Sequence, residues 1–113
     1  MDAPRLVDRL EWPNFQIELG KSYVHAELQG EVVYVHDVHT NDDRLRGIAR
    51  SMLEKTVAVG LEFGAKMFAT TPETHDGQEF FSRIFDELGV RVHRCETLAL
   101  PLIIVARVLR QDD

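Results

Sequence analysis

The chain has 113 residues, of which 44% are hydrophobic and 28% charged, and its formal net charge is −6. This size and composition predict one globular domain, and the acidic balance argues against a general nucleic-acid binder, which needs a basic face. No apolar run reaches the roughly 18–20 residues of a transmembrane helix. The single cysteine and the absence of a signal-peptide pattern predict a cytoplasmic location.

The first forty residues are patterned for a short helix followed by three strands. Residues 3–10 could form the helix, with Asp2 as its cap. Residues 15–19 alternate apolar and polar side chains, as half-buried strands do, and residues 22–28 and 31–39 are predicted as two further strands. Because only short turns separate them, the three strands should be antiparallel neighbours.

The hydrophobic period then becomes helical. A helix is predicted from Arg50 to Phe63, and Asn41, Asp42 or Asp43 could cap the start of this segment. Gly64 is a natural stop for the helix. Residues 66–70 read as a short strand, so that strand, helix and strand should form a right-handed parallel crossover.

The last part of the chain is predicted to contain one helix and two strands. The helix spans residues 76–88, and the strands span residues 90–96 and 98–109, with Pro101 at a bulge or an edge. The predicted order is therefore a short helix, three strands, a helix, a strand, a helix and two strands. This order indicates an α+β fold in which helices cover a mixed sheet.

The segment between the third strand and the long helix is suited to binding an anion. It reads Arg44-Leu45-Arg46-Gly47-Ile48-Ala49. The first N–H groups of a helix have no intrahelical partner and carry partial positive charge, and glycine lets the backbone approach a ligand closely. The alternative is an ordinary solvated helix start, next to which Asp42 and Asp43 would disfavour an anion.

Two motifs within this order resemble the GCN5-related N-acetyltransferase superfamily. The superfamily's acetyl-coenzyme A signature is Gln or Arg, two residues, Gly, one residue, then Gly or Ala, and Arg44-x-x-Gly47-x-Ala49 is similar to it. The segment Ile84-Phe85-Asp86-Glu87-Leu88-Gly89-Val90 is similar to the end of the superfamily's last helix. The resemblance covers residues 15–109.

The resemblance implies a coenzyme site. The backbone N–H groups of residues 45–49 would bind the coenzyme pyrophosphate, and Arg44 and Arg46 would add positive charge. A backbone N–H around Val38 or His39 would receive the thioester oxygen. Phe85 takes the place of a tyrosine that often lies beside the leaving thiolate; it could contact the coenzyme, but it has no hydroxyl to act as a general acid.

Two side chains at the end of the third strand are candidate general bases, Asp37 and His39, with His36 as a reserve. Strand alternation predicts Asp37 and His39 on one face, and Tyr34, His36 and Val38 on the other. His36 and His39 should then be unable to share a metal ion, so no metal site is predicted. The alternative is that these are ordinary polar residues of a strand end, and Cys95 is predicted to pack rather than to react.

The resemblance implies an acetyltransferase that moves acetyl from acetyl-coenzyme A directly to an amine of a small molecule or protein. Relatives usually place a helix pair between their first two strands, and here only a short segment precedes Phe15. The alternative is therefore a catalytically weak or inactive module that binds the coenzyme or a protein partner. A homodimer is expected, because a missing wall leaves apolar edge to cover.

Overall fold

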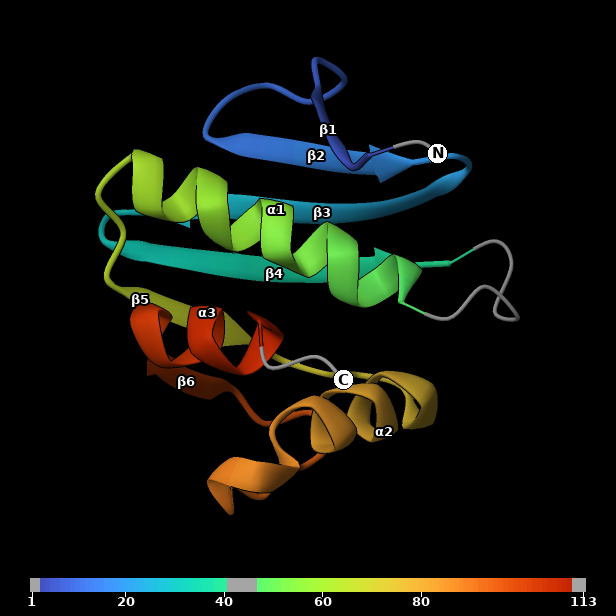
Figure 1. Cartoon of the computed structure of the whole chain (residues 1–113), viewed down its shortest axis with the longest axis vertical. Coiled ribbons are helices and arrows are strands. Elements are labelled where there is room, and N and C mark those ends of the chain that lie inside the picture. Colours follow the sequence, from blue (N-terminus) through green and yellow to red (C-terminus); the bar gives the residue numbers. More distant parts are fainter. Residues whose placement is uncertain (1–2, 41–46, 111–113) are drawn as a thin grey trace.

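Six strands form one sheet in the computed structural model, which describes residues 3–40 and 47–110. Three α-helices and one short 3-10 helix accompany the sheet (Figure 1). The fold is therefore a mixed α+β fold, as predicted. The strands are β1 (Arg5–Val7), β2 (Asn14–Leu19), β3 (Ser22–Gln29), β4 (Val32–His39), β5 (Met67–Thr70) and β6 (Leu98–Pro101); the helices are α1 (Ile48–Glu62), α2 (His75–Ile84), η1 (Asp86–Leu88) and α3 (Leu102–Arg110).

The strands lie side by side in the order in which they follow one another in the chain. Neighbours are antiparallel except for β4 and β5, which are parallel and are connected through α1. The predicted antiparallel trio and the parallel crossover are confirmed. Gly20 and Gly30 adopt φ of 62° in the two tight turns that join the trio, a conformation that glycine adopts without strain.

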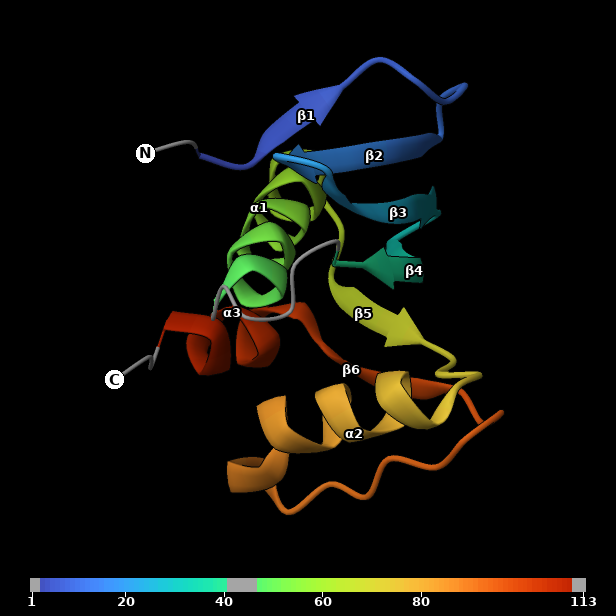
Figure 2. The same cartoon turned by 90° about the vertical axis from the view of Figure 1, so that its right-hand side faces the viewer.

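One face of the sheet packs against α1 and α3, and Figure 2 shows both helices on the same side. α1 begins two residues earlier than predicted and ends just before Gly64, as predicted. Gly60 lets α1 approach the sheet closely, since an added Cβ would lie 3.3 Å from Val33 and from Leu102. The buried side chains that fill this layer include Phe15, Ile17, Val24, Ala26, Val33, Val35, Met52, Leu53, Val57, Val105 and Leu109.

The opposite face carries Tyr23, His25, Tyr34 and His39, which alternate with the buried residues of β3 and β4. No helix of the described ranges packs against it (Figure 2). We call it the uncovered face. None of the helices in these ranges has the length and apolar character needed to span a membrane.

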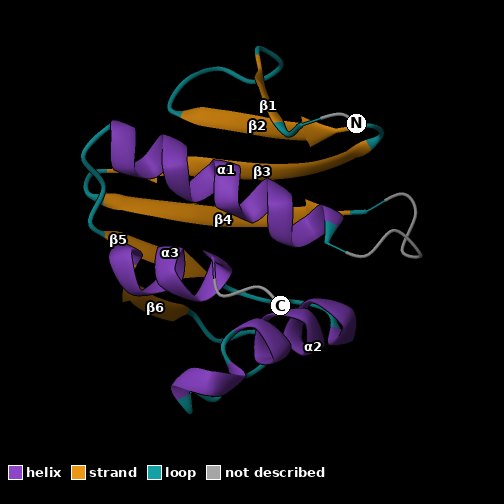
Figure 3. Cartoon of the chain, in the orientation of Figure 1, coloured by secondary structure: helices purple, strands orange, loops and turns teal. Residues whose placement is uncertain are grey.

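The predicted helix over residues 3–10 is wrong. Arg5–Val7 forms the edge strand β1, in which Leu6 lies opposite Ile17 of β2 (Figure 3). An isolated two-turn helix is marginal in water, whereas strand pairing satisfies the backbone groups of an otherwise unpaired β2 edge.

The two predicted C-terminal strands also need correction. Residues 90–96 form a loop rather than a strand, although Val92 is buried and accepts a hydrogen bond from the Gln78 side chain at 3.0 Å. Cys95 is exposed in this loop with φ of 64°, so its predicted packing role is wrong. The segment 98–109 splits into the edge strand β6 and the helix α3, which packs on α1. The predicted strand over residues 98–109 is therefore wrong beyond Pro101.

The second predicted helix is shorter than expected. α2 ends at Ile84, and a 3-10 turn, η1, follows it and closes at Gly89. Gly89 adopts φ of 67°, the left-handed conformation that commonly ends helices. Pro101 lies on an edge strand, one of the two positions predicted for it.

Candidate functional site

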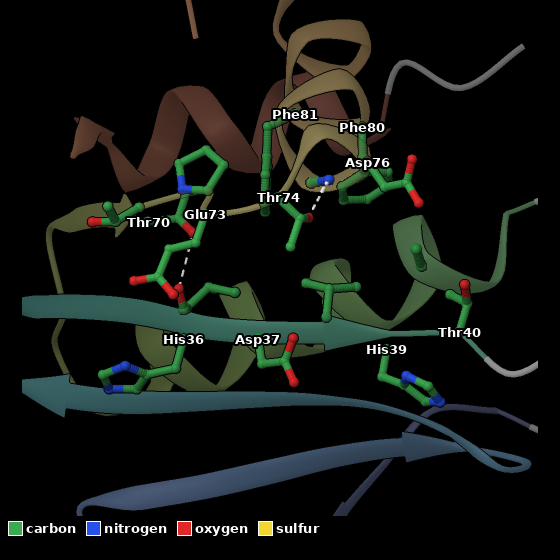
Figure 4. Close-up of a pocket in the computed structure, with 16 residues that line it drawn as sticks. His36, Asp37, His39, Thr40, Thr70, Glu73, Thr74, Asp76, Phe80 and Phe81 are labelled. Atoms are coloured by element: carbon green, nitrogen blue, oxygen red, sulfur yellow. Dashed lines mark hydrogen bonds between the residues drawn. The ribbon is translucent and has the colours of Figure 1, made fainter. Parts of the chain in front are cut away.

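A crevice opens where β4 and β5 separate. The two strands pair from Val32 and Met67 to Val35 and Thr70, after which β5 ends and β4 continues to His39. A cavity of about 430 Å³ lies there, between the end of β4, the start of α1 and the β5–α2 turn (Figure 4). Ligands of open sheets with parallel strands commonly bind in such a crevice at the carboxyl ends of the strands.

Thr70 fixes the point at which the strands part. Its side chain is 3% exposed, and its hydroxyl donates a 2.9 Å hydrogen bond to the carbonyl oxygen of Val35. The hydroxyl thus satisfies a buried acceptor at the position where ladder pairing with β5 stops. The last residue of the shorter strand therefore holds the longer strand at the inner end of the crevice.

A β-bulge in β4 determines which side chains face the same way. Ala26 of β3 lies opposite Val35, whereas the preceding residue, His25, lies opposite Asp37, so His36 is an extra residue. Bulges of this kind reset the alternation of side chains along a strand.

Asp37 and His39 share the uncovered face, as predicted, because they lie opposite His25 and Tyr23. Tyr34 and His36 lie on the same face, so the prediction that placed them on the other side is wrong. The His36 ring lies 4.7 Å from that of Tyr34, centroid to centroid. Figure 4 shows His36, Asp37 and His39 on one side of β4. Among residues 36–39 of β4, Val38 is the one whose side chain turns toward the core, where it lies opposite Val24 of β3.

No metal site was predicted because His36 and His39 were expected on opposite faces of β4. Since they share one face, that reason no longer holds. The two histidines nevertheless have different neighbours, since the His36 ring contacts His25 and Tyr34, and the His39 ring stacks on Tyr23 at 5.1 Å. Over residues 3–40 and 47–110, no group of three or more His, Cys, Asp or Glu side chains is placed to hold a metal ion.

The bulge brings two imidazoles together. His25 and His36 have ring centroids 4.9 Å apart; His25 is hydrogen-bonded to Asn14 at 3.1 Å and His36 to Glu27 at 2.8 Å. Burial, and then the nearby His36, lower the pKa of His25, which is therefore neutral at neutral pH. The hydrogen bond from His36 lowers the pKa of Glu27.

The start of α1 faces the crevice. Gly47 caps the helix with φ of 86° and no acidic residue occupies the first turn, so the free N–H groups of that turn keep their partial positive charge. Ala49 lines the crevice. Arg50 turns away, since its guanidinium donates to the carbonyl oxygens of Val108 and Leu109 at 2.5 and 3.2 Å, at the end of α3.

The described lining of the crevice is acidic. It carries Asp37, Glu73 and Asp76, together with His36 and His39, and no described lysine or arginine lines it. The predicted coenzyme residues Arg44, Leu45 and Arg46 lie outside the described residues. Any anion bound here would therefore depend on the α1 N–H groups at residues 47–49 and on positive charge supplied from outside the described lining.

Phe85 does not line the crevice. Its ring is 0% exposed and packs edge-on against Phe68 at 5.9 Å and parallel to Phe81 at 6.2 Å, which makes it a core residue. The predicted coenzyme contact of Phe85 therefore has no exposed surface to use in this arrangement. Phe80 and Phe81, in the middle of α2, line the crevice instead.

Residues after β5 form the wall that sequence reasoning missed. Thr71, Glu73, Thr74 and Asp76 line the crevice opposite β4. Thr74 also caps α2, because its hydroxyl accepts the N–H of Gly77 at 3.0 Å. The predicted parallel crossover could have identified this wall, since it places the ends of β4 and β5 at the same edge of the sheet.

The chain was also compared with known proteins. No family model matches it, and no curated protein matches its sequence. Its function is therefore inferred from the crevice and from the motif at residues 44–49.

Proposed function

We propose that this chain is an N-acetyltransferase of the GCN5-related type, which binds acetyl-coenzyme A in the crevice between β4 and β5. The observation that supports the proposal best is the meeting of two features in one cavity: the carboxyl ends of two diverging parallel strands, and the start of α1, where the N-cap residue Gly47 makes no side-chain hydrogen bond. An elongated ligand with a thioester at one end and a pyrophosphate farther along its length suits this combination, with the pyrophosphate at the helix start.

In this proposal the coenzyme is bound mainly by backbone groups. The N–H groups of residues 45–49 bind the pyrophosphate, Gly47 allows the close approach, and Arg44 and Arg46 balance the charge. Val38 lines the crevice, and its backbone N–H would donate to the thioester carbonyl, whose oxygen gains negative charge during attack.

Asp37 and His39 are the proposed bases for the attacking amine. Both are exposed on the uncovered face at the crevice. The exposed Asp37 carboxylate would accept a proton or attract an ammonium group. His39 has the side-chain type best suited to proton transfer near neutral pH. Direct transfer needs no covalent enzyme intermediate.

The acceptor is proposed to be an amine of a small molecule or protein, which the carboxylates of Glu73 and Asp76 would attract as a cation. A cytoplasmic location and a homodimer belong to the same proposal. Trp12 and Phe63, which are 49% and 57% exposed and whose rings lie 4.9 Å apart, supply apolar surface that a second subunit could cover.

A binding module without turnover is the second candidate. Two features favour it. Phe85 has no hydroxyl, and the acidic lining of the crevice would weaken the binding of a coenzyme that carries a high negative charge. Such a module would act as a regulator or inhibitor through the coenzyme or through a protein partner.

Calorimetric titration with acetyl-coenzyme A and with free coenzyme A tests the proposal. We expect micromolar binding by the wild type and none by Gly47→Glu, whose carboxylate would occupy the start of α1. Gly64→Glu is the matched control, because Gly64 has a similar φ of 83° and equally open space but lies beyond the other end of α1. No binding by the wild type at millimolar ligand would refute the coenzyme site. Binding without thiol release across a panel of amines would favour the second candidate.

A further inference from the structure

Five side chains with rings lie together on the uncovered face of the sheet, and we call them the ring platform. They are Tyr23 and His25 of β3, and Tyr34, His36 and His39 of β4. The centroid of the His36 ring lies 4.7 Å from that of Tyr34 and 4.9 Å from that of His25, and His39 stacks on Tyr23 at 5.1 Å. From residue 34 to residue 39, β4 extends roughly 15 Å, which is the length of the platform.

Three of the rings are held in place through their polar atoms. His25 is hydrogen-bonded to Asn14 at 3.1 Å, His36 to Glu27 at 2.8 Å, and the Tyr34 hydroxyl to the Thr71 hydroxyl. His36 and His39 are exposed, and the other three members of the platform are half-buried. A partner that contacts rings already held in position loses less conformational entropy on binding.

The charge on this face is negative. The strands β2, β3 and β4 contain no lysine or arginine, and they place the carboxylates of Glu18, Glu27 and Asp37 on the uncovered face. Glu18 forms an ion pair with Arg9, so the charge at the centre of the face comes from Glu27 and Asp37. The lowered pKa of His25 keeps this residue neutral, and it adds no positive charge.

The two central carboxylates border the ring platform. Glu27 lies opposite Tyr34, and Asp37 follows His36 in β4. The hydrogen bonds that Glu27 makes with His36 and Gln29, at 2.8 and 3.1 Å, both use Oε1, so these contacts occupy one of its two carboxylate oxygens. The hydrogen bond from His36 also lowers the pKa of Glu27, which keeps the carboxylate ionised.

Rings beside carboxylates suit a guanidinium group better than an ammonium group. A guanidinium is planar, so it can stack on an aromatic ring while its N–H groups reach a neighbouring carboxylate. An ammonium is a more strongly hydrated point charge and lacks this geometry. The side chains of an extended peptide point to one side at every second residue, so a platform of this length can meet more than one of them.

We infer that the uncovered face binds an extended, arginine-bearing segment of a protein partner, whose guanidinium groups stack on the ring platform and pair with Glu27 and Asp37. The charge of the chain, −6, agrees with a cationic partner. His36, Asp37 and His39 also line the crevice, so the bound segment would reach its edge. This inference goes beyond the proposed function and does not depend on coenzyme binding.

The first test uses fluorescent hexa-arginine, hexa-lysine and hexa-glutamate peptides and measures their anisotropy with the wild-type protein at pH 7.5. Hexa-arginine should bind saturably and more tightly than hexa-lysine, with an affinity that falls as salt is added, and hexa-glutamate should not bind. The double variant Glu27→Lys with Asp37→Lys should lose hexa-arginine binding. Glu54→Lys with Glu62→Lys is the matched control, because it makes the same change of charge at exposed positions of α1, which covers the other face.

The second test concerns the rings. Tyr34→Leu should weaken hexa-arginine binding roughly 2- to 5-fold, the effect of one cation–π contact at an exposed site, and Tyr34→Phe, which keeps the ring, should weaken it less. Thermal unfolding of each variant shows whether it is folded. If the ring pairs only stabilise the sheet, Tyr34→Leu will lower the stability and leave the peptide affinity unchanged, which would overturn the role of the platform.

Other results would also overturn the inference. They are no binding of hexa-arginine by the wild type, equal affinity for hexa-lysine, retained binding by Glu27→Lys with Asp37→Lys, and peptide-induced amide NMR shifts confined to α1 and α3. Self-association in sedimentation that the same double variant abolishes would assign the face to a second copy of the chain instead. Calorimetry with acetyl-coenzyme A is independent of these results, so the failure of either proposal can be recognised separately.

Discussion

The two halves of β4 differ in almost every respect although they are adjacent in one eight-residue strand. Residues 32–35 pair with β3 on one side and β5 on the other, and their inward side chains, Val33 and Val35, are at most 1% exposed. Residues 36–39 pair with β3 alone, begin with a bulge and expose three polar side chains. The first half is fixed by packing, whereas the end of β5 leaves the second half paired on one side only.

The largest difference should appear when the same charge is placed in each half. Val33→Asp would bury an unpaired carboxylate in the core and should cost roughly 3–5 kcal/mol of unfolding free energy or prevent folding. His39→Asp, in the exposed half, should change it by less than about 0.5 kcal/mol. Urea denaturation followed by circular dichroism measures both. Equal destabilisation by the two changes would mean that the halves are not distinct.

A smaller effect is expected at the boundary between the halves. Thr70→Val keeps the side-chain shape but leaves the Val35 carbonyl oxygen without its hydroxyl donor, which should cost about 1–3 kcal/mol. Thr97→Val, which removes an exposed hydroxyl, serves as the comparison and should cost less. Denaturant midpoints at equal m-value give the two numbers. A Thr70→Val protein as stable as the wild type would show that Val35 finds another donor.

The smallest effect concerns pH and His25 of β3, which lies opposite Asp37 in the second half of β4. The pKa of His25 is lowered in the folded state from an ordinary value of 6.5, so the unfolded chain binds the proton first as the pH falls. Stability contributed by neutral His25 is therefore present above about pH 6.5 and is lost progressively below it. His25→Gln should flatten this loss between pH 7.5 and 5.5, measured by urea denaturation at each pH. An unchanged pH dependence in this variant would assign the loss to other groups.

The sequence predicted well where its pattern was long and local. Alternation and glycine turns placed β2, β3 and β4, and helical periodicity placed α1, because both signals depend only on neighbouring residues. β1 was missed because three residues carry no readable period. α3 was misread as strand, although Leu102, Val105, Ala106 and Leu109 show helical spacing.

The site was predictable in part. Asp37 and His39 were placed on a common face, and Gly47 and Ala49 at the start of α1 beside the crevice. The extra residue at His36 was not foreseen, since a bulge depends on pairing with β3 and leaves no mark in the strand itself. The coenzyme contact of Phe85 came from the resemblance alone, and the ring of Phe85 lies in the core. The β5–α2 wall required knowing which strands would be neighbours.

The agreement between strand order in the sheet and strand order in the chain has a consequence for biosynthesis. Each strand joins the edge left by the strand before it, and no strand has to insert between two that are already paired. A ribosome releases the N-terminal residues first, so each emerging strand meets its neighbour already in place. Two steps must wait: β5 closes on β4 only after α1 has been synthesised, and β6 pairs with β5 only after α2 and η1 have been synthesised. The crevice should therefore be the last part of the sheet to acquire its shape, when β5 and β6 complete the far edge.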